Sequence, residues 1–492
     1  MLKSDFTGMK VLIMGLGLNG GNVEAARYLA RAGAEITVTD LRDEKTLSPS
    51  LKELSQFSIR CVLGRHEMED FRNADMVIKN PGVRPDSPYL AAARRIETDI
   101  SIFLTASPAR LLAVTGSKGK SSVSAALHHA LGESRSMGLL KGKARLGGNI
   151  ALSPLSFLDD LEEGDDAVLE LSSWQLGDLR GLSLLKPRAA IITPIMKDHL
   201  DRYGSMEAYA ADKRLIYRNQ DEADLTVACD DEWGRSFLGE SRGRPLAYSE
   251  RPLPGELPGG WIANPRGPGF ARLWEIPAAG NIQGGMKNTA GYNGAGRDER
   301  GSIVEIVPDR LLVPGLHQKQ NLLAAALALL DLGLPADFIR ESLGRFPGIP
   351  HRMEFFHECC EIRFYDDTCA TIPEAAAAAI TAFEKAPVLV CGGTDKNLDF
   401  TPLALAAKNA KALILISGSG TDKLKILLDR NRIKYHGPFD SLEAAAGGAM
   451  DAAAPGDNVV LSPGCTSFGM FLNEFERGNK WKEEIKKLGS NR

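Results

Sequence analysis

Residues 114–122 read Val114-Thr115-Gly116-Ser117-Lys118-Gly119-Lys120-Ser121-Ser122. An apolar run, 111–114, enters this segment, and an Ala- and Leu-rich helical pattern, 123–131, leaves it. A strand, a glycine turn and a helix in that order cradle phosphate, because glycines let backbone N–H groups converge on it at the helix N-terminus. Lys120 is then placed to reach terminal phosphates, and the Ser121 hydroxyl to hold Mg²⁺. The segment predicts an ATP site formed by Gly116, Ser117, Lys118, Gly119, Lys120, Ser121 and Ser122.

The spacing of this turn differs from that of the common P-loop. Four residues separate the glycines of a P-loop, whereas two separate Gly116 from Gly119. A glycine-lysine-serine string also occurs in ordinary turns, so the segment alone leaves both interpretations open. Glu170 lies near the end of a later apolar strand, 167–171. P-loop enzymes hold Mg²⁺ with an acid at such a position, which favours the phosphate site.

Composition bounds the class of protein. The 492 residues are too many for one hydrophobic core and predict roughly three domains. A hydrophobic share of 43% and a charged share of 25% are typical of a soluble globular chain. The net charge of -4 gives no footprint for nucleic acid, and no apolar run is long enough to span a membrane. Seven cysteines without a CxxC pair and an N-terminus without an export signal predict a cytoplasmic protein with reduced thiols.

Residues 10–40 predict a βαβ unit with its own glycine turn. A strand at 10–14 leads into Gly15-Leu16-Gly17-Leu18-Asn19-Gly20, and a second strand ends at Asp40. This GxGxxG pattern with a distant acid fits a dinucleotide fingerprint, which suggests a dehydrogenase. The pyrophosphate of a nucleotide sugar and a purely structural turn remain alternatives, because tight strand-to-helix packing also favours glycine. Asn80-Pro81-Gly82 follows a further strand, at the edge where open α/β sheets bind ligands.

The rest of the chain repeats the α/β alternation. Asn149 follows two glycines, His199 lies in an Asp-His-Leu-Asp string, and Lys213 lies on a predicted helix, 206–217. Residues 240–300 are crowded with Pro and Gly and predict a flexible insertion outside the catalytic core. Polar loops at strand ends recur after residue 350. We therefore predict three α/β domains: a Rossmann-like domain at 1–107, a P-loop ATPase-like domain at 108–349, and a dinucleotide-fold-like domain at 350–492.

The ordered series of these motifs resembles the Mur ligase family, in particular its D-glutamate-adding members. The resemblance extends over nearly the whole chain. It rests on the Gly15 turn, Asn80-Pro81-Gly82, 115–122, Gly147-Gly148-Asn149, 169–173, 198–201, 204–209, Lys213, His351-Arg352, Gly392-Gly393 with Lys396, and 461–463. It implies ATP-dependent addition of glutamate, with D-glutamate favoured, to UDP-N-acetylmuramoyl-L-alanine through an acyl phosphate. The enzyme would be a monomer that makes a peptidoglycan precursor.

The resemblance also implies roles for single residues. Lys120 would contact ATP phosphates, Ser121 and Glu170 would hold one Mg²⁺, and His199 with a carbamylated Lys213 would hold a second. An ammonium repels Mg²⁺, whereas its CO₂ adduct offers an anionic oxygen. The catalytic residues would be Lys120, His199 and Lys213. The other implied contacts are Gly15, Asp40, Asn80 and Asn149 with the UDP substrate, Asn321 with adenine, Arg352 and Asp367 with the ATP phosphates and ribose, and Thr371, Lys396 and Ser467 with the amino acid.

Three positions depart from the family pattern. Lys118 and Gln318 each replace an asparagine, and Cys369 lies where D-glutamate-adding members usually have lysine. Losing that charge-assisted bond would cost about 1.5–3 kcal/mol unless another cation replaces it. L-glutamate or another amino acid therefore remains an alternative substrate. A folylpolyglutamate-synthase-like ligase and an NAD-dependent oxidoreductase are further alternatives. The first would not need the N-terminal domain, since it has no UDP to bind. The second would leave Lys120, Glu170 and Lys213 without a role.

Overall fold

The computed structural model describes residues 3–18, 20–150, 152–254, 257–264, 267–273, 302–467 and 469–490. Asn19, Phe468 and positions 255, 256, 265, 266 and 274–300 of the predicted insertion lie outside the described residues. The chain divides into two compact units, of which the first comprises Met1–Asp309 with Lys319–Leu343 and the second Arg310–Gln318 with Gly344–Arg492. None of the described helices is long and apolar enough to cross a membrane.

The first sheet of unit 1 has five parallel strands in the order β3-β2-β1-β4-β5. The strands are β1 (Lys10–Met14), β2 (Glu35–Asp40), β3 (Arg60–Leu63), β4 (Met76–Lys79) and β5 (Ile96–Glu97), and the helices are α1 (Gly21–Arg31), α2 (Glu44–Glu53), α3 (Met68–Asn73) and α4 (Asp99–Ala106). Val11 and Ile13 join the same core as α1, whereas Leu12 and Met14 join the core of α3. Because alternate side chains of a strand point to opposite faces, this sheet is covered on both sides.

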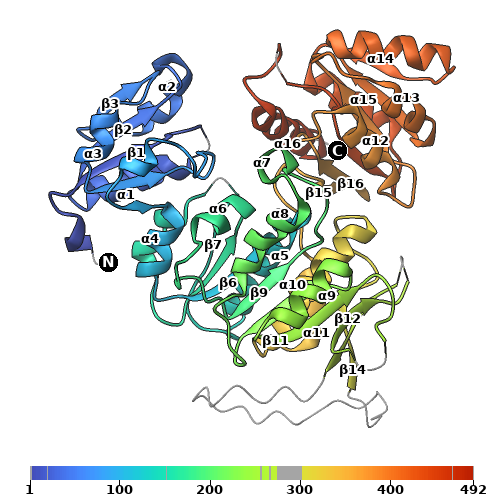
Figure 1. Ribbon diagram of the computed structural model, residues 1–492. Coiled ribbons are helices and arrows are strands. Elements are labelled where there is room, and N and C mark those ends of the chain that lie inside the picture. Colours follow the sequence, from blue (N-terminus) through green and yellow to red (C-terminus); the bar gives the residue numbers. More distant parts are fainter. Residues whose placement is uncertain are drawn as a thin grey trace. The chain divides into compact units, whose positions relative to one another are not determined.

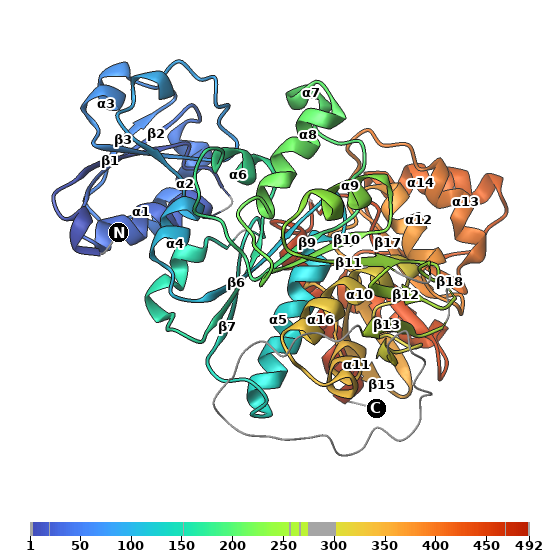
Figure 2. The ribbon, with the colours of Figure 1, turned by 60° about the horizontal axis from the view of Figure 1, so that its bottom comes forward.

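The second sheet of unit 1 has nine strands in the order β14-β13-β12-β11-β10-β9-β6-β8-β7. The strands are β6 (Arg110–Thr115), β7 (Ala144–Gly148), β8 (Asp166–Glu170), β9 (Ala189–Ile192), β10 (Leu225–Cys229), β11 (Arg244–Ser249), β12 (Gly259–Ile262), β13 (Gly269–Leu273) and β14 (Ser302–Val307). The helices are α5 (Lys120–Ser136), α6 (Ser173–Asp178), α7 (Leu200–Tyr203), α8 (Met206–Lys213), α9 (Glu232–Glu240), α10 (Leu316–Asp331) and α11 (Ala336–Gly344). Figures 1 and 2 both show α6 and α8 side by side next to β6.

The strands that follow β6 in the chain lie on both sides of it in the sheet. β8 and β7 lie on one side of β6, and β9, the next strand in the chain, lies on the other. Open α/β sheets bind ligands at such a switch point, outside the carboxyl ends of the strands. The turn that follows β6 is the glycine turn at Gly116, so the topology exposes it at the ligand-binding edge.

Three strands lie in the part of the chain for which the sequence predicts an irregular insertion. β11 pairs in parallel with β12, and β12 pairs antiparallel with β13. A Cβ at Gly259 would lie 1.8 Å from the carbonyl oxygen of Ala247, and one at Gly260 would lie 2.9 Å from Leu323 of α10. These glycines therefore permit close packing of sheet and helix, although glycine is usually a loop signal.

Unit 2 contains a six-stranded sheet in the order β15-β16-β20-β17-β18-β19, in which only the β15–β16 pair is antiparallel among the described pairs. The strands are β15 (Glu354–Cys359), β16 (Ile362–Asp366), β17 (Val388–Gly392), β18 (Ala412–Ile416), β19 (His436–Phe439) and β20 (Asn458–Leu461). Its helices are α12 (Pro373–Thr381), α13 (Thr401–Ala406), α14 (Ser419–Arg430), α15 (Leu442–Ala452) and α16 (Glu474–Ser490). One core contains side chains of α15 and α16, and the other those of α12, α13 and α14. The predicted α/β class is confirmed.

Candidate active site

The turn between β6 and α5 requires glycine at two positions. Gly116 has a φ of 137° and Gly119 a φ of 93°. A Cβ at Gly116 would lie 1.9 Å from Oγ1 of Thr193, and a Cβ at Gly119 would lie 2.3 Å from Oδ1 of Asn321. Asn321, predicted to contact adenine, is thereby placed directly against the glycine turn.

Helix α5 presents a bare N-terminus to this turn. Its N-cap, Gly119, makes no side-chain capping bond, and the first helical turn contains no acidic residue. The first N–H groups of a helix have no intrahelical acceptors, and the helix dipole makes this end positive. The end of α5 therefore suits an anion such as a phosphate.

Two lysine ammonium groups converge on one carbonyl oxygen of the turn. The Nζ atoms of Lys120 and Lys213 each donate to the Gly116 carbonyl at 2.9 Å. Lys120 also donates to the Ser117 carbonyl at 3.1 Å, and Lys213 to Oγ1 of Thr115 at 3.4 Å. The sequence places these lysines far apart, and the fold brings them to the same peptide group.

Burial disfavours the charge on Lys213. Its side chain is 1% exposed, and burial together with the neighbouring charge of Lys120 lowers the pKa of Lys213 to about 7. Burial also lowers the pKa of Lys120. A large fraction of Lys213 is thus a neutral amine near pH 7, which is the nucleophilic form of a lysine.

Glu170 lies beside the turn with one carboxylate oxygen unsatisfied. β8 pairs with β6 so that Glu170 is opposite Val114. Its Oε1 accepts a hydrogen bond from Nδ2 of Asn149 at 3.0 Å, whereas its buried Oε2 has no partner among the described residues. A buried acceptor without a donor is rare, and a carboxylate oxygen is the ligand that Mg²⁺ prefers. Glu170 therefore fits the predicted metal site.

His199 joins this cluster through aromatic contacts. It precedes α7 with a φ of 52°, and its ring centre lies 5.2 Å from that of Trp174 and 6.1 Å from that of Tyr209. The Tyr209 hydroxyl lies 3.0 Å from Oγ of Ser117, and Nζ of Lys213 lies 4.6 Å from the Tyr209 ring centre. Tyr209 thus contacts both the glycine turn and the two predicted metal-binding side chains.

The predicted substrate residues of the first sheet lie close together. The Asp40 carboxylate accepts hydrogen bonds from the backbone N–H of Gly17 at 3.1 Å and of Arg42 at 2.9 Å. Oδ1 of Asn80 accepts from the Gly82 N–H at 2.9 Å, and a Cβ at Gly15 would lie 3.1 Å from Cβ of Asn80. Asp40 therefore stabilises the first glycine turn itself.

One cavity of about 1240 Å³ connects the two glycine turns. The predicted residues that line it are Gly15, Asp40, Asn80, Gly116, Lys120, Asn149, His199 and Lys213. A buried ion pair at 2.7 Å between Lys79, which precedes Asn80, and Asp178 of α6 links the walls of this cavity. Both turns therefore face a common space in which two ligands can meet.

In unit 2 the predicted residues lie on neighbouring loops. Thr394 and Thr466 exchange backbone hydrogen bonds of 3.2 and 3.1 Å, which places the loop of Lys396 beside that of Ser467. The Gly464 N–H donates to the Ala370 carbonyl at 2.8 Å, so the loop of Thr371 joins them.

The two predicted ATP contacts of unit 2 differ in burial. Arg352 is exposed. Asp367 accepts hydrogen bonds from Oγ of Ser462 at 2.7 Å and from the Met353 N–H at 3.1 Å. Burial nevertheless raises the pKa of Asp367 to about 7. Asp367 is therefore partly protonated at neutral pH.

Sequence reasoning missed several residues of the main cavity, including Tyr209, Trp174 and Gln175. Tyr209 lies four residues before Lys213 on α8, and residues at this spacing share a helix face. That spacing was the available signal for Tyr209. Gln175 completes a capping box with Ser172 at the start of α6, a spacing that signals a helix start and not a binding site, and no motif marks Trp174.

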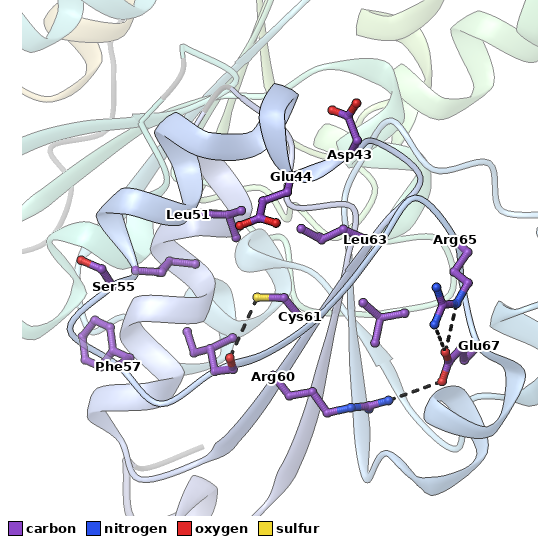
Figure 3. Close-up of a pocket in the computed structure, with 13 residues that line it drawn as sticks. Asp43, Glu44, Leu51, Ser55, Phe57, Arg60, Cys61, Leu63, Arg65 and Glu67 are labelled. Atoms are coloured by element: carbon purple, nitrogen blue, oxygen red, sulfur yellow. Dashed lines mark hydrogen bonds and ion pairs between the residues drawn. The ribbon is translucent and has the colours of Figure 1, made fainter.

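A second cavity, of about 760 Å³, lies between α2 and β3. Figure 3 shows that Arg60 and Arg65 both reach the carboxylate of Glu67. Arg60 also pairs with Asp70 at 2.5 Å. No predicted site residue lines this cavity, and its cations are paired.

Comparison with known proteins identifies relatives over the whole chain. Family models match in three places: the MurD-like N-terminal domain of Mur ligases at 9–102, the Mur ligase middle domain at 114–250, and the Mur ligase glutamate ligase domain at 351–465. The UDP-N-acetylmuramoylalanine--D-glutamate ligase of Treponema pallidum (strain Nichols) is 39% identical, over 97% of this chain and 98% of the relative. The enzyme of that name from Roseiflexus sp. (strain RS-1) is 38% identical, over 98% and 99% of the two chains.

Solved structures share the fold at lower identity. The UDP-N-acetylmuramate-alanine ligase MurC of Thermotoga maritima matches with a TM-score of 0.54 and 20% identity, over 98% of this chain and 100% of the other. The MurF ligase of Thermotoga maritima, solved with ADP, matches with a TM-score of 0.52 and 16% identity, over 100% and 98%. The predicted three-domain architecture is therefore confirmed.

Proposed function

Since the chain belongs to the Mur ligase family, we propose that it catalyses the ATP-dependent joining of D-glutamate to UDP-N-acetylmuramoyl-L-alanine. The relatives that are named for this reaction cover nearly the full chain. The observation that carries the proposal is the cavity shared by the two glycine turns, which suits a sugar nucleotide at Gly15 and a nucleoside triphosphate at Gly116.

The reaction must begin by activating a carboxylate, because a carboxylate is a poor electrophile. A carboxylate oxygen of the alanyl group attacks the γ-phosphorus of ATP, and ADP leaves. The glutamate nitrogen then attacks the acyl carbon, loses a proton, and inorganic phosphate leaves as the amide forms. Charge builds on the phosphate oxygens in the first step, where Lys120 and the N-terminus of α5 stabilise it.

Mg²⁺ fits the residues of this site. The unpaired Oε2 of Glu170 and the hydroxyl of Ser121 would hold one ion, and His199 would help to hold another. When bound, Mg²⁺ neutralises phosphate charge and polarises the phosphorus–oxygen bonds. Asn149 fixes the Glu170 carboxylate by donating to its other oxygen.

Lys213 becomes a carbamate in this proposal. Its neutral amine adds to CO₂, forming an N–C bond and releasing one proton, and the product carries an anionic oxygen. The low pKa of Lys213 and its burial beside Lys120 support this step, because a protonated amine does not react with CO₂. An anion at this position would also offset the charge of Lys120.

The second unit would bind the incoming amino acid through Thr371, Lys396 and Ser467, whose loops are joined by backbone hydrogen bonds. Cys369 supplies no positive charge in the same loop, because a thiol is either neutral or anionic. Burial raises the pKa of this thiol, which keeps it neutral. The preference for glutamate must therefore come from other cations of this unit.

ADP release tests the proposal. The purified protein is mixed with ATP, Mg²⁺, UDP-N-acetylmuramoyl-L-alanine and each of a panel of D- and L-amino acids. We expect ADP release with D-glutamate and not with L-glutamate. UDP-N-acetylglucosamine serves as the control, because it keeps the nucleotide and lacks the reacting carboxylate. ADP release with another amino acid and none with D-glutamate would contradict the specificity, and no ligation with any of them would contradict the function.

A further inference from the structure

Arg352 lies between two residues whose backbone conformation is unusual for a side chain. His351 has a φ of 66° and Met353 a φ of 47°, and neither residue is glycine. Left-handed backbone is costly for such residues and persists only where the surrounding structure holds it. The side chain of Arg352, a predicted ATP contact, is exposed. Neighbouring groups must therefore hold the strained segment, 351–353, in its conformation.

Three carboxylates hold the strained segment. The backbone N–H of His351 donates to Oε2 of Glu354 at 2.9 Å, and Nδ1 of its ring lies 2.7 Å from Oδ2 of Asp366. The N–H of Met353 donates to Oδ1 of Asp367 at 3.1 Å. His351 is thus fixed by one carboxylate at its backbone and by another at its ring.

The two carboxylates that fix His351 lie close together. An oxygen atom of Glu354 and one of Asp366 lie within 4.8 Å of each other. Like charges at this separation repel, most strongly where water is excluded, and Asp366 is fully buried. The Nζ of Lys482 donates to Oε2 of Glu354 and lies 3.4 Å from Oδ2 of Asp366. The ammonium therefore offsets the repulsion at the same two oxygen atoms that contact His351.

Helix α16 brings Lys482 to this position along one of its faces. Phe475, Gly478 and Lys482 are spaced by three and four residues, so they share a helix face. The ring centre of Phe475 lies 5.4 Å from that of His351. A Cβ at Gly478 would lie 2.6 Å from Oδ2 of Asp366, so this close approach requires glycine. One face of α16 is therefore fitted to the strained segment.

We propose that Lys482 positions Arg352 for contact with the ATP phosphates. The ammonium keeps both carboxylates on His351, and their hydrogen bonds hold the strained segment in the conformation that presents the arginine side chain. Lys482 is a positioning residue, because it acts through Glu354 and Asp366. The inference rests on the proposed function, with Arg352 as a contact of ATP, and adds the residue that holds this contact in place.

The measurement is KM for ATP in the ADP-release assay. Lys482→Met removes the ammonium, and we expect KM for ATP to rise ~10-fold, because the arginine is no longer held in place. Lys482→Arg keeps the charge and should keep this KM within about 3-fold of the wild-type value. KM for UDP-N-acetylmuramoyl-L-alanine should not change. The Kd of a non-hydrolysable ATP analogue, measured with this substrate present, should rise in the same proportion as KM for ATP.

Lys480→Met is the matched control. Lys480 is exposed two residues earlier on α16 and pairs with Glu476 at 2.9 Å. Because this pair lies away from the strained segment, the variant should leave KM for ATP unchanged. A rise in Lys480→Met equal to that in Lys482→Met would show a general effect of charge on α16 and would overturn the inference.

A double-mutant cycle separates positioning from a general loss of structure. Arg352→Ala should raise KM for ATP by ~30-fold, and Lys482→Met should add nothing to it, because the positioned side chain is already gone. Glu354→Gln weakens the contact with Lys482 while its amide oxygen can still accept from His351. This milder variant should raise KM for ATP by ~3-fold, again only when Arg352 is present. It decides the question if a thermal melt shows that Lys482→Met does not fold.

The outcomes separate this inference from the proposed function. Effects of Lys482→Met and Arg352→Ala that multiply in the double variant would show that the two residues act independently and would overturn the inference. An unchanged KM for ATP in either single variant would overturn it as well. The wild-type protein would still ligate D-glutamate in these cases. A wild-type protein that releases no ADP with any amino acid would overturn both.

Discussion

The turn after β1 and the turn after β6 have the same backbone plan and different surroundings. Both helices begin after a glycine N-cap with positive φ, 80° at Gly20 and 93° at Gly119, and neither N-cap makes a side-chain capping bond. Glu24 lies in the first turn of α1, whereas Lys120 begins α5. An anion is therefore favoured more strongly at the second helix than at the first.

The side chains that contact the two turns differ in charge, and again the second turn is the more positive. The Asp40 carboxylate accepts the N–H of Gly17 in the first turn, and two ammonium groups donate to the Gly116 carbonyl in the second. The first turn is thus satisfied by an acid of its own sheet, while the second gathers positive charge. Glycines give a turn its shape, and the neighbouring charges determine which part of a nucleotide it can bind.

The largest effect is expected from adding a methyl group to each turn. In Gly116→Ala the alanine would have to adopt a φ of 137°, and its Cβ would lie 1.9 Å from Oγ1 of Thr193. We expect this variant to lose at least ~3 kcal/mol of stability and ~10³-fold in the rate of ADP release. Gly17→Ala meets only Nδ2 of Asn80, at 3.5 Å, and should cost about 1–2 kcal/mol for its left-handed φ. Urea unfolding and ADP release measure both. Equal losses in the two variants would contradict the comparison.

A smaller effect, ~10²-fold in activity, is expected from Lys213→Met, which removes the amine that becomes the carbamate under the proposed function. This change also tests the pKa of Lys213 in protein freed of CO₂. Burial lowers that pKa from 10.5 to about 7, so between these values the unfolded chain holds a proton that the folded chain has lost. The free energy of unfolding should therefore rise with pH from about 7 to 10.5, and this contribution should be constant below pH 7.

Urea midpoints from pH 6 to pH 9 measure that slope. Lys213→Met should lose the rise above pH 7, and the control Lys186→Met, at an exposed lysine paired with Asp221, should keep it. Bicarbonate should restore the activity of CO₂-depleted wild-type protein faster at pH 8 than at pH 6, because more of the amine is neutral. An identical pH slope in wild type and Lys213→Met would show that Lys213 has an ordinary pKa.

The comparison also shows what the sequence could predict. Apolar runs are local signals, and the predicted strands at 10–14 and 167–171 agree with β1 and β8 within a residue. The strands β12 and β13 were missed because their glycines, Gly259 and Gly269 among them, serve close packing, which depends on neighbours distant in sequence.

The candidate active site shows the same limit of prediction from sequence. Motifs predicted Lys120 and Lys213 separately, but their shared carbonyl depends on α8 packing against a turn 97 residues earlier. Such properties arise from tertiary packing, and periodicity or spacing does not encode them.

The smallest effect is expected at the exposed tip of each turn. Leu18 is exposed in the first turn, and Lys118 is exposed in the second. Lys118→Leu makes the second tip resemble the first and removes one charge near the triphosphate. We expect KM for ATP to rise by only ~2–3-fold, because water screens an exposed charge. The rise should disappear in ~0.5 M salt, where the Debye length falls well below 10 Å. Lys45→Leu on α2 removes another exposed charge and should leave KM for ATP unchanged. A rise in KM for ATP that persists in high salt in Lys118→Leu would show that Lys118 contacts the phosphates directly. The difference in charge between the two turns would then include their exposed tips as well as their buried residues.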